Sequence, residues 1–183
     1  AIYGACARDT ELTGVILSDG AELRDLRLAD GASIEGAGVM LEGVESMRTI
    51  AISGDAFATE LAVRTATTGV LVTGSLHVAR FYASGIIGAA IKVDHGALTL
   101  DGGVVDGNRA VTNDGAIHLE GRSIVRGVYL EGVEKLGLFL GGTYAVQDVV
   151  IRELGSAPPD LTRRGAIWIE GRGTLHRSEE HTS

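Results

Sequence analysis

A short motif recurs along this chain and constrains its fold more than any other feature. It consists of a small residue, an apolar–variable–apolar triplet, and then polar residues with, usually, a glycine. Each triplet is too short for a helix and alternates with the period of a β-strand. One unit cannot bury its own inward side chains, so copies at roughly 20 to 31 residues predict an all-β parallel solenoid rather than a hairpin array. The triplets are Val15-Ile16-Leu17, Val39-Met40-Leu41, Val70-Leu71-Val72, Ile91-Lys92-Val93, Ile117-His118-Leu119, Leu138-Phe139-Leu140 and Ile167-Trp168-Ile169.

A second pattern lies behind each triplet: apolar, two polar or small residues, apolar, any residue, apolar. Its central pair interrupts the alternation, which predicts a bend between two sheets. The pattern is clear at residues 23–28, 47–52, 125–130 and 146–151, and looser at 78–83 and 100–105. Residues 56–63 are compatible with a helical turn capped by Asp55 or with an extra strand. We favour the strand, because residues 58–63 repeat the second pattern.

Composition agrees with stacked strands and excludes one class of partner. The chain of 183 residues has 45% hydrophobic but only 4% aromatic residues, and 27 glycines against 2 prolines. Small and β-branched side chains with many turns suit strands, and the length favours one domain. The net charge of −8 argues against nucleic acid, which needs a basic surface. No run is long enough to cross a bilayer, so we expect no transmembrane segment.

Three local features need separate interpretation. Cys6 is the only cysteine, so it is either a buried thiol or pairs outside this chain. Pro158 and Pro159 predict a protruding loop over residues 156–164, since proline donates no ladder hydrogen bond. Residues 177–183 resemble a translated sequencing adapter, with a natural polar tail as the alternative. We therefore expect the solenoid to span residues 1–176 and treat 177–183 as non-native.

The triplets predict rows of outward side chains, because the flanking residues of each triplet should point inward. The middle residues form one row, Ile16, Met40, Leu71, Lys92, His118, Phe139 and Trp168, and the next outward positions are Ser18, Glu42, Thr73, Asp94, Glu120, Gly141 and Glu170. Phe139 and Trp168 are candidates for stacking on sugar rings. Asp94, Glu120 and Glu170 are candidates for binding hydroxyls or a calcium ion. The predicted binding residues are thus Lys92, Asp94, His118, Glu120, Phe139, Trp168 and Glu170; alternatively, the apolar row is covered and the carboxylates are simply solvated.

The chain resembles a known family in three places. These are Tyr3-Gly4-Ala5-Cys6-Ala7, the repeated glycine–apolar–x–apolar–x–glycine, and residues 149–153 followed by a loop into Gly165-Ala166-Ile167. It resembles the secreted bacterial right-handed parallel β-helix repeat proteins of the pectin-lyase-like superfamily over nearly all of residues 1–176. The resemblance implies a right-handed, single-stranded parallel β-helix of about six to seven coils, secreted or at the cell surface. That superfamily includes lyases, hydrolases and adhesins, so the fold does not transfer an activity.

Two functions therefore remain open. The first is a non-catalytic structural or recognition segment, whose partner is a polysaccharide or another surface protein. The second is a lyase, glycoside hydrolase or glycan-binding module that uses Lys92, Asp94, His118, Glu120 and Trp168. A lyase needs a basic residue beside acidic calcium ligands, for which Lys92, Arg122 and Arg126 are the candidates, and an inverting glycosidase needs carboxylates roughly 6.5 to 9.5 Å apart. No catalytic residue is assigned, since Thr112-Asn113-Asp114 has the wrong order for the family's Asn-Thr-Asp motif.

Overall fold

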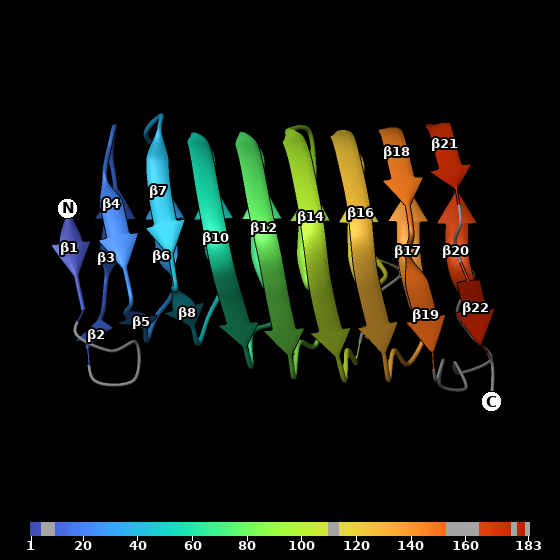
Figure 1. The fold of residues 1–183 in the computed structure, drawn as a ribbon, viewed down its shortest axis with the longest axis horizontal. Helices are drawn as coiled ribbons and strands as arrows, with labels where there is room; N and C mark the ends of the chain where they lie inside the picture. The colour runs from blue at the N-terminus through green and yellow to red at the C-terminus, as the bar shows by residue number, and fades with distance from the viewer. Residues whose placement is uncertain (5–9, 110–113, 153–164, 177–178, 182–183) are drawn as a thin grey trace.

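The chain folds into a parallel β-solenoid of about seven turns. The computed structural model describes residues 1–4, 10–109, 114–152, 165–176 and 179–181, and these contain strands but no helix. In Figure 1 the front strands run downward and the rear strands upward while the chain advances from left to right, so the winding is right-handed. Neighbouring strands pair in parallel in both sheets. The predicted fold class is confirmed.

The solenoid is built from two sheets (Figure 1). The rear sheet has eight strands: β3 (Val15–Leu17), β6 (Ala32–Ile34), β9 (Ile50–Ile52), β11 (Val70–Val72), β13 (Ile91–Val93), β15 (Ile117–Leu119), β17 (Leu136–Leu140) and β20 (Gly165–Ile169). The front sheet has 14 strands: β1 (Ile2–Tyr3), β2 (Glu11–Leu12), β4 (Glu22–Arg24), β5 (Arg27–Leu28), β7 (Val39–Glu42), β8 (Glu45–Ser46), β10 (Asp55–Arg64), β12 (Ser75–Ser84), β14 (Ala97–Asp106), β16 (Arg122–Glu131), β18 (Thr143–Gln147), β19 (Val150–Arg152), β21 (Arg172–His176) and β22 (Glu179–His181). Each turn therefore passes once through each sheet.

The front sheet bends where the six-residue pattern places its polar or small pair. In β10, β12, β14 and β16 the second residue of that pair has a positive φ: 59° at Glu60, 60° at Arg80, 80° at Gly102 and 61° at Gly127. One left-handed residue per strand turns the chain without ending the ladder, because the register resumes directly afterwards. Residues 55–64 form a strand, so the favoured alternative for 56–63 is confirmed.

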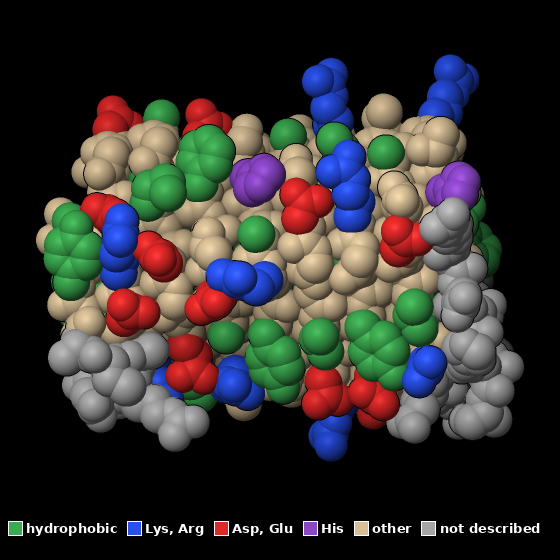
Figure 2. Space-filling model, in the orientation of Figure 1, with side chains coloured by type: hydrophobic (Ala, Val, Ile, Leu, Met, Phe, Trp, Pro, Cys, Tyr) green, Lys and Arg blue, Asp and Glu red, His purple; other side chains and the backbone are tan. Residues whose placement is uncertain are grey.

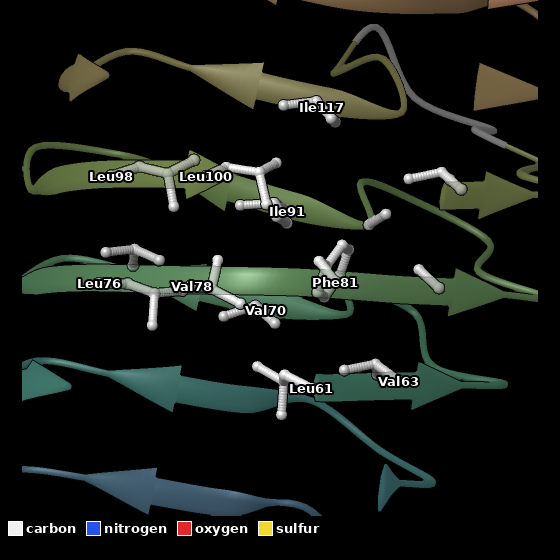
Figure 3. Packing of buried hydrophobic residues seen from close by; sticks show 14 of the residues in the cluster. Leu61, Val63, Val70, Leu76, Val78, Phe81, Ile91, Leu98, Leu100 and Ile117 are labelled. Atoms are coloured by element: carbon white, nitrogen blue, oxygen red, sulfur yellow. The ribbon is translucent and has the colours of Figure 1, made fainter. Parts of the chain in front are cut away.

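The core consists of aliphatic side chains stacked from one turn to the next. Val70, Ile91 and Ile117 occupy equivalent positions in β11, β13 and β15, and all three are buried. Figure 3 shows them facing Val78 and Leu100 of the opposite sheet across the interior. This packing removes apolar surface from water along the whole axis. The predicted inward orientation of the first and third residues of these three triplets is confirmed.

A column of glycines follows the rear sheet, at the turn that leads into the front sheet. A Cβ placed on Gly96 would lie 2.0 Å from the carbonyl oxygen of Gly74 in the preceding turn. Nearly the same clash, at 2.0 to 2.1 Å, recurs between each glycine and the one before it. The members of this glycine column are Gly36, Gly54, Gly74, Gly96, Gly121, Gly142 and Gly171. Only glycine allows the backbone of successive turns to approach this closely.

The first turns are assigned differently from the prediction. Val39, Met40 and Leu41 belong to β7 in the front sheet, where Met40 pairs with Phe57, and they are not a rear-sheet triplet. Ala32-Ser33-Ile34 and Ile50-Ala51-Ile52 take that place in the rear sheet. The prediction was wrong because apolar alternation is the same in both sheets, so it does not say which strands share hydrogen bonds.

The outward rows change accordingly. Residues 50–52 had been assigned to the bend pattern at 47–52, but they form β9, so that assignment was wrong. Met40 and Glu42 leave the predicted rows for the front sheet, where Glu42 pairs with Thr59. Ser33 and Ala51 occupy the middle positions in the rear sheet instead. The apolar row is therefore interrupted near its N-terminal end.

The ends of the chain complete this description. Strand β22 pairs with β19, so part of residues 177–183 extends the front sheet; the non-native origin of that segment stays a prediction. Cys6 and the predicted loop at 156–164 lie outside the described residues. Within the described part, the structure has no helix with the length and hydropathy needed to cross a bilayer.

Glu45 on β8 links three turns and makes stability depend on pH. Its carboxylate accepts hydrogen bonds from Arg27, at 3.0 and 3.1 Å, and from Arg64. Burial by itself would raise the pKa of Glu45, but the hydrogen bonds from Arg64 and Arg27 outweigh it and lower the pKa. A carboxyl whose folded pKa is depressed stabilises the fold above its unfolded pKa, and this contribution is lost as the pH falls through the folded pKa.

Glu45→Gln should therefore lower the free energy of unfolding near neutral pH by about 1 kcal/mol, a modest value because both arginines are partly exposed. Urea denaturation of the variant and the parent should show the difference shrinking at a pH well below the carboxylate range. An equal difference at both pH values would show that the ion pairs are not its source.

Candidate functional site

The predicted binding residues lie on neighbouring strands of the rear sheet. Lys92 on β13 pairs in register with His118 on β15, His118 with Phe139 on β17, and Phe139 with Trp168 on β20. Parallel pairing puts these side chains on the same outer face at successive strand spacings. Asp94, Glu120 and Glu170 follow two residues after Lys92, His118 and Trp168. The structure thus brings the predicted residues into two adjacent rows of side chains.

Two rings at the centre of these rows are covered. The His118 and Phe139 rings stack with centroids 4.3 Å apart and planes inclined by 22°. His118 is 3% exposed and Phe139 is 1% exposed, yet neither belongs to the aliphatic core inside the solenoid. They are outward residues buried by their surroundings. In this arrangement neither ring face is open to a sugar.

Lys92 neutralises two carboxylates. Its Nζ lies 3.7 Å from Asp94 Oδ1 and 3.5 Å from Asp114 Oδ1. The ammonium group therefore occupies the position between carboxylates that a cation would need. Among the residues that the structure describes, no group of three or more His, Cys, Asp or Glu side chains is arranged to hold a metal ion. The calcium hypothesis gains no support in this part of the chain.

His118 is held between Asp114, which it shares with Lys92, and Glu120. Its Nδ1 lies 3.0 Å from the main-chain oxygen of Asp114, and because a carbonyl only accepts, Nδ1 carries the hydrogen. Its Nε2 is buried without a hydrogen-bond partner, although Glu120 Oε1 lies 3.1 Å away. The two atoms are close, but their geometry is not that of a hydrogen bond. The imidazole is thus oriented by its neighbours rather than open to solvent.

Trp168 and Glu170 form a separate pair at the C-terminal end of the rows. Trp168 Nε1 donates a hydrogen bond of 2.9 Å to Glu170 Oε1, and this contact is exposed. The Trp168 side chain is only partly buried. Of the predicted aromatic residues on this face, Trp168 is the one that keeps a surface open to solvent.

The contacts described above join Lys92, Asp94, His118, Glu120 and Phe139 into one cluster on the rear sheet. This cluster contains one further residue that the prediction omitted. Asp114 contacts both Lys92 and His118, and it lies in the turn that precedes β15. Its spacing of four residues from His118 is not diagnostic outside a helix, and the sequence pointed to Asp114 only within Thr112-Asn113-Asp114, a hydrolase-like motif in the wrong order. Conversely, Arg122 and Arg126, considered as bases for a lyase, lie on β16 in the front sheet, where Arg126 is 3.5 Å from Asp101.

The chemistry available to this cluster is limited by its internal pairing. Lys92 is shared between two carboxylates and His118 is buried, so neither is free to abstract a proton from a substrate. Glu120 retains 45% exposure of its side chain, against 34% for Asp94 and 30% for Asp114, and is the most accessible acid of the cluster. The arrangement fits charge neutralisation along the outer face better than acid–base catalysis.

No protein-family model, no curated protein and no solved structure matches this chain. Functional inference therefore rests on the fold and on the placement of its side chains.

Proposed function

We propose that this chain is a rigid, non-catalytic segment of a secreted or cell-surface bacterial protein, related to the right-handed parallel β-helix proteins of the pectin-lyase-like superfamily. Its role is structural, with recognition of a polysaccharide or another surface protein as an added capacity. One observation carries the proposal: the reactive side chains of the cluster are already engaged with one another. Lys92 neutralises the carboxylates of Asp94 and Asp114, and His118 is buried against Phe139.

The fold supports the structural part of the proposal. Paired strands run from β1 to β22 with one continuous front sheet, so each turn is held by both neighbours. The glycine column adds close backbone contact from Gly36 to Gly171. A solenoid held in this way resists bending and keeps surface side chains at fixed spacings. Such a body suits a spacer or a display surface.

A polysaccharide-active enzyme or a glycan-binding module that uses the rear face is the alternative. Its candidates remain Lys92, Asp94, His118, Glu120 and Trp168, and their binding role remains a prediction. The partly exposed Trp168 and Glu120 favour weak binding at the edges of the cluster over catalysis at its centre. An enzyme would require the His118 and Phe139 pair to open.

A turnover assay tests the proposal directly. The whole chain is incubated with polygalacturonate, alginate and a neutral β-glucan, and unsaturated ends and reducing ends are measured. We expect no product above the level of a Glu120→Gln variant, because no group of the described cluster combines a free base with an open substrate surface. Product formation that Glu120→Gln or Lys92→Met abolishes would replace this proposal with the enzyme.

A further inference from the structure

The front sheet carries an open hollow of about 350 Å³ near the start of its long strands. Its side-chain lining includes Asp55 and Phe57 of β10, Ser75 and His77 of β12, and Thr99 of β14. Figure 2 shows hydrophobic side chains over β7 and β10 beside a histidine over β12 on this face. The volume lies in the range of small-ligand sites. The hollow lies on the front sheet and is separate from the cluster on the rear sheet.

The hollow arises from two outward rows of unequal size. Phe57, His77 and Thr99 are register partners on successive strands and form the first row. Asp55, Ser75 and Ala97 form the second row, two residues earlier on the same strands. Because Ser75 and Ala97 are small, the space over β12 and β14 stays open beside the row of Phe57, His77 and Thr99. The inward residues between the rows, such as Leu76, are buried.

The wall of the hollow is aromatic and exposed. Phe57 is 49% exposed, and its ring centroid lies 6.2 Å from that of His77, with the planes inclined by 33°. This contrasts with the covered pair of His118 and Phe139 on the other sheet. An exposed phenyl ring on a rigid strand offers a flat apolar surface at low entropic cost to a ligand.

His77 Nε2 lies 3.9 Å from Asp101 Oδ2, whereas the other polar side chains around this wall are unused. Within the described contacts, the Asp55 carboxylate forms no ion pair and no side-chain hydrogen bond, and the Ser75 and Thr99 hydroxyls form none either. Lysine and arginine are missing from the described lining. The hollow therefore combines one apolar plane, one acceptor carboxylate, one imidazole and two hydroxyls.

We propose that this hollow binds a pyranose ring of a neutral glycan. The apolar face of the sugar packs on Phe57, and its hydroxyl groups donate to Asp55 and exchange hydrogen bonds with Ser75 and Thr99. A uronate is disfavoured, because a carboxylate ligand needs a cation and would meet the charge of Asp55 instead. The inference rests on the recognition capacity in the proposed function and gives it a site and a ligand class; the structural role stands whether or not the hollow binds a sugar.

Calorimetric titration of the whole chain with cellohexaose, and with hexagalacturonate as its acidic counterpart, tests this inference. We expect saturable binding of cellohexaose and weaker binding of hexagalacturonate. Phe57→Ala should weaken cellohexaose binding about tenfold, through loss of the stacking surface. Asp55→Asn should narrow the difference in affinity between cellohexaose and hexagalacturonate. The substitution removes the repulsion between the Asp55 carboxylate and the uronate carboxylates and keeps the shape of the side chain.

Tyr129→Ala is the matched control. Tyr129 is an outward aromatic residue on β16, beyond the bend, with the Arg152 guanidinium 5.5 Å from its ring centre, and it does not line the hollow. Its loss should leave the affinity unchanged. Absence of saturable cellohexaose binding, equal or tighter binding of hexagalacturonate, or no effect of Phe57→Ala would each overturn the inference. The turnover assay described above tests the non-catalytic role separately, so its result does not depend on whether the hollow binds cellohexaose.

Discussion

Gly96→Ala should lower the free energy of unfolding by about 3 kcal/mol or more, which is a large fraction of the total in a marginally stable chain. The added methyl group would lie 2.0 Å from the carbonyl oxygen of Gly74 and 2.9 Å from the backbone carbon of Thr73. These are backbone atoms, so no side chain can rotate away. Relief requires the turns to separate, which weakens the bond from Ala97 N to Gly74 O at 2.8 Å. Urea denaturation followed by circular dichroism measures the loss.

Gly102→Ala provides the control for this substitution. Gly102 has a φ of 80°, and nothing lies within 4 Å of the position that its Cβ would occupy. The same methyl group there meets only backbone strain, so a cost of about 1 kcal/mol is expected. If both variants lost equal stability, close approach of successive turns would not be what requires glycine in the column.

Phe81→Ala should lower the free energy of unfolding by about 3 to 5 kcal/mol. Phe81 on β12 is 2% exposed and packs in the aliphatic core just after the bend, where Figure 3 shows it pointing into the interior beside Leu61 and Val63. Removing its ring leaves a cavity that the hydrogen-bonded turns above and below cannot close. Thermal and urea melts of the variant measure the effect, and Phe81→Leu should recover most of the loss.

Phe57→Ala is the counterpart with identical chemistry on the outer face. Phe57 is about half exposed, so its loss should cost less than about 1 kcal/mol. A cost as large as that of Phe81→Ala would mean that the outward row on β10 carries packing energy. It would also remove this variant as a specific probe of the hollow.

Much of the rear face could be predicted from single triplets. In Ile91-Lys92-Val93 the flanking residues are apolar and the middle one is charged, so alternation alone orients Lys92 outward. The same reasoning placed His118 and Phe139 on the outer face, and the register pairs confirm that they are neighbours. Their burial could not be predicted, because it depends on the ring stack between two turns and on what surrounds it.

The errors have a common source. Val39-Met40-Leu41 has the same pattern as the rear-sheet triplets, and only its pairing with residues 56–58 assigns it to the front sheet. Asp114 joined the cluster through a turn rather than through the repeat. The hollow is formed by residues of β10, β12 and β14 together, so the sequence of no single strand predicts it.

The recurring apolar pattern with its following glycines was sufficient, by itself, to determine a parallel solenoid and the inward or outward side of most strand residues, because alternation and turn chemistry are local properties of the chain. The tertiary structure alone decided which segments share a sheet, which outward rings are covered, and where exposed aromatic and unpaired polar groups meet. Those outcomes depend on hydrogen-bond register between turns that are distant in sequence, and one shift of register changes every neighbour of a side chain.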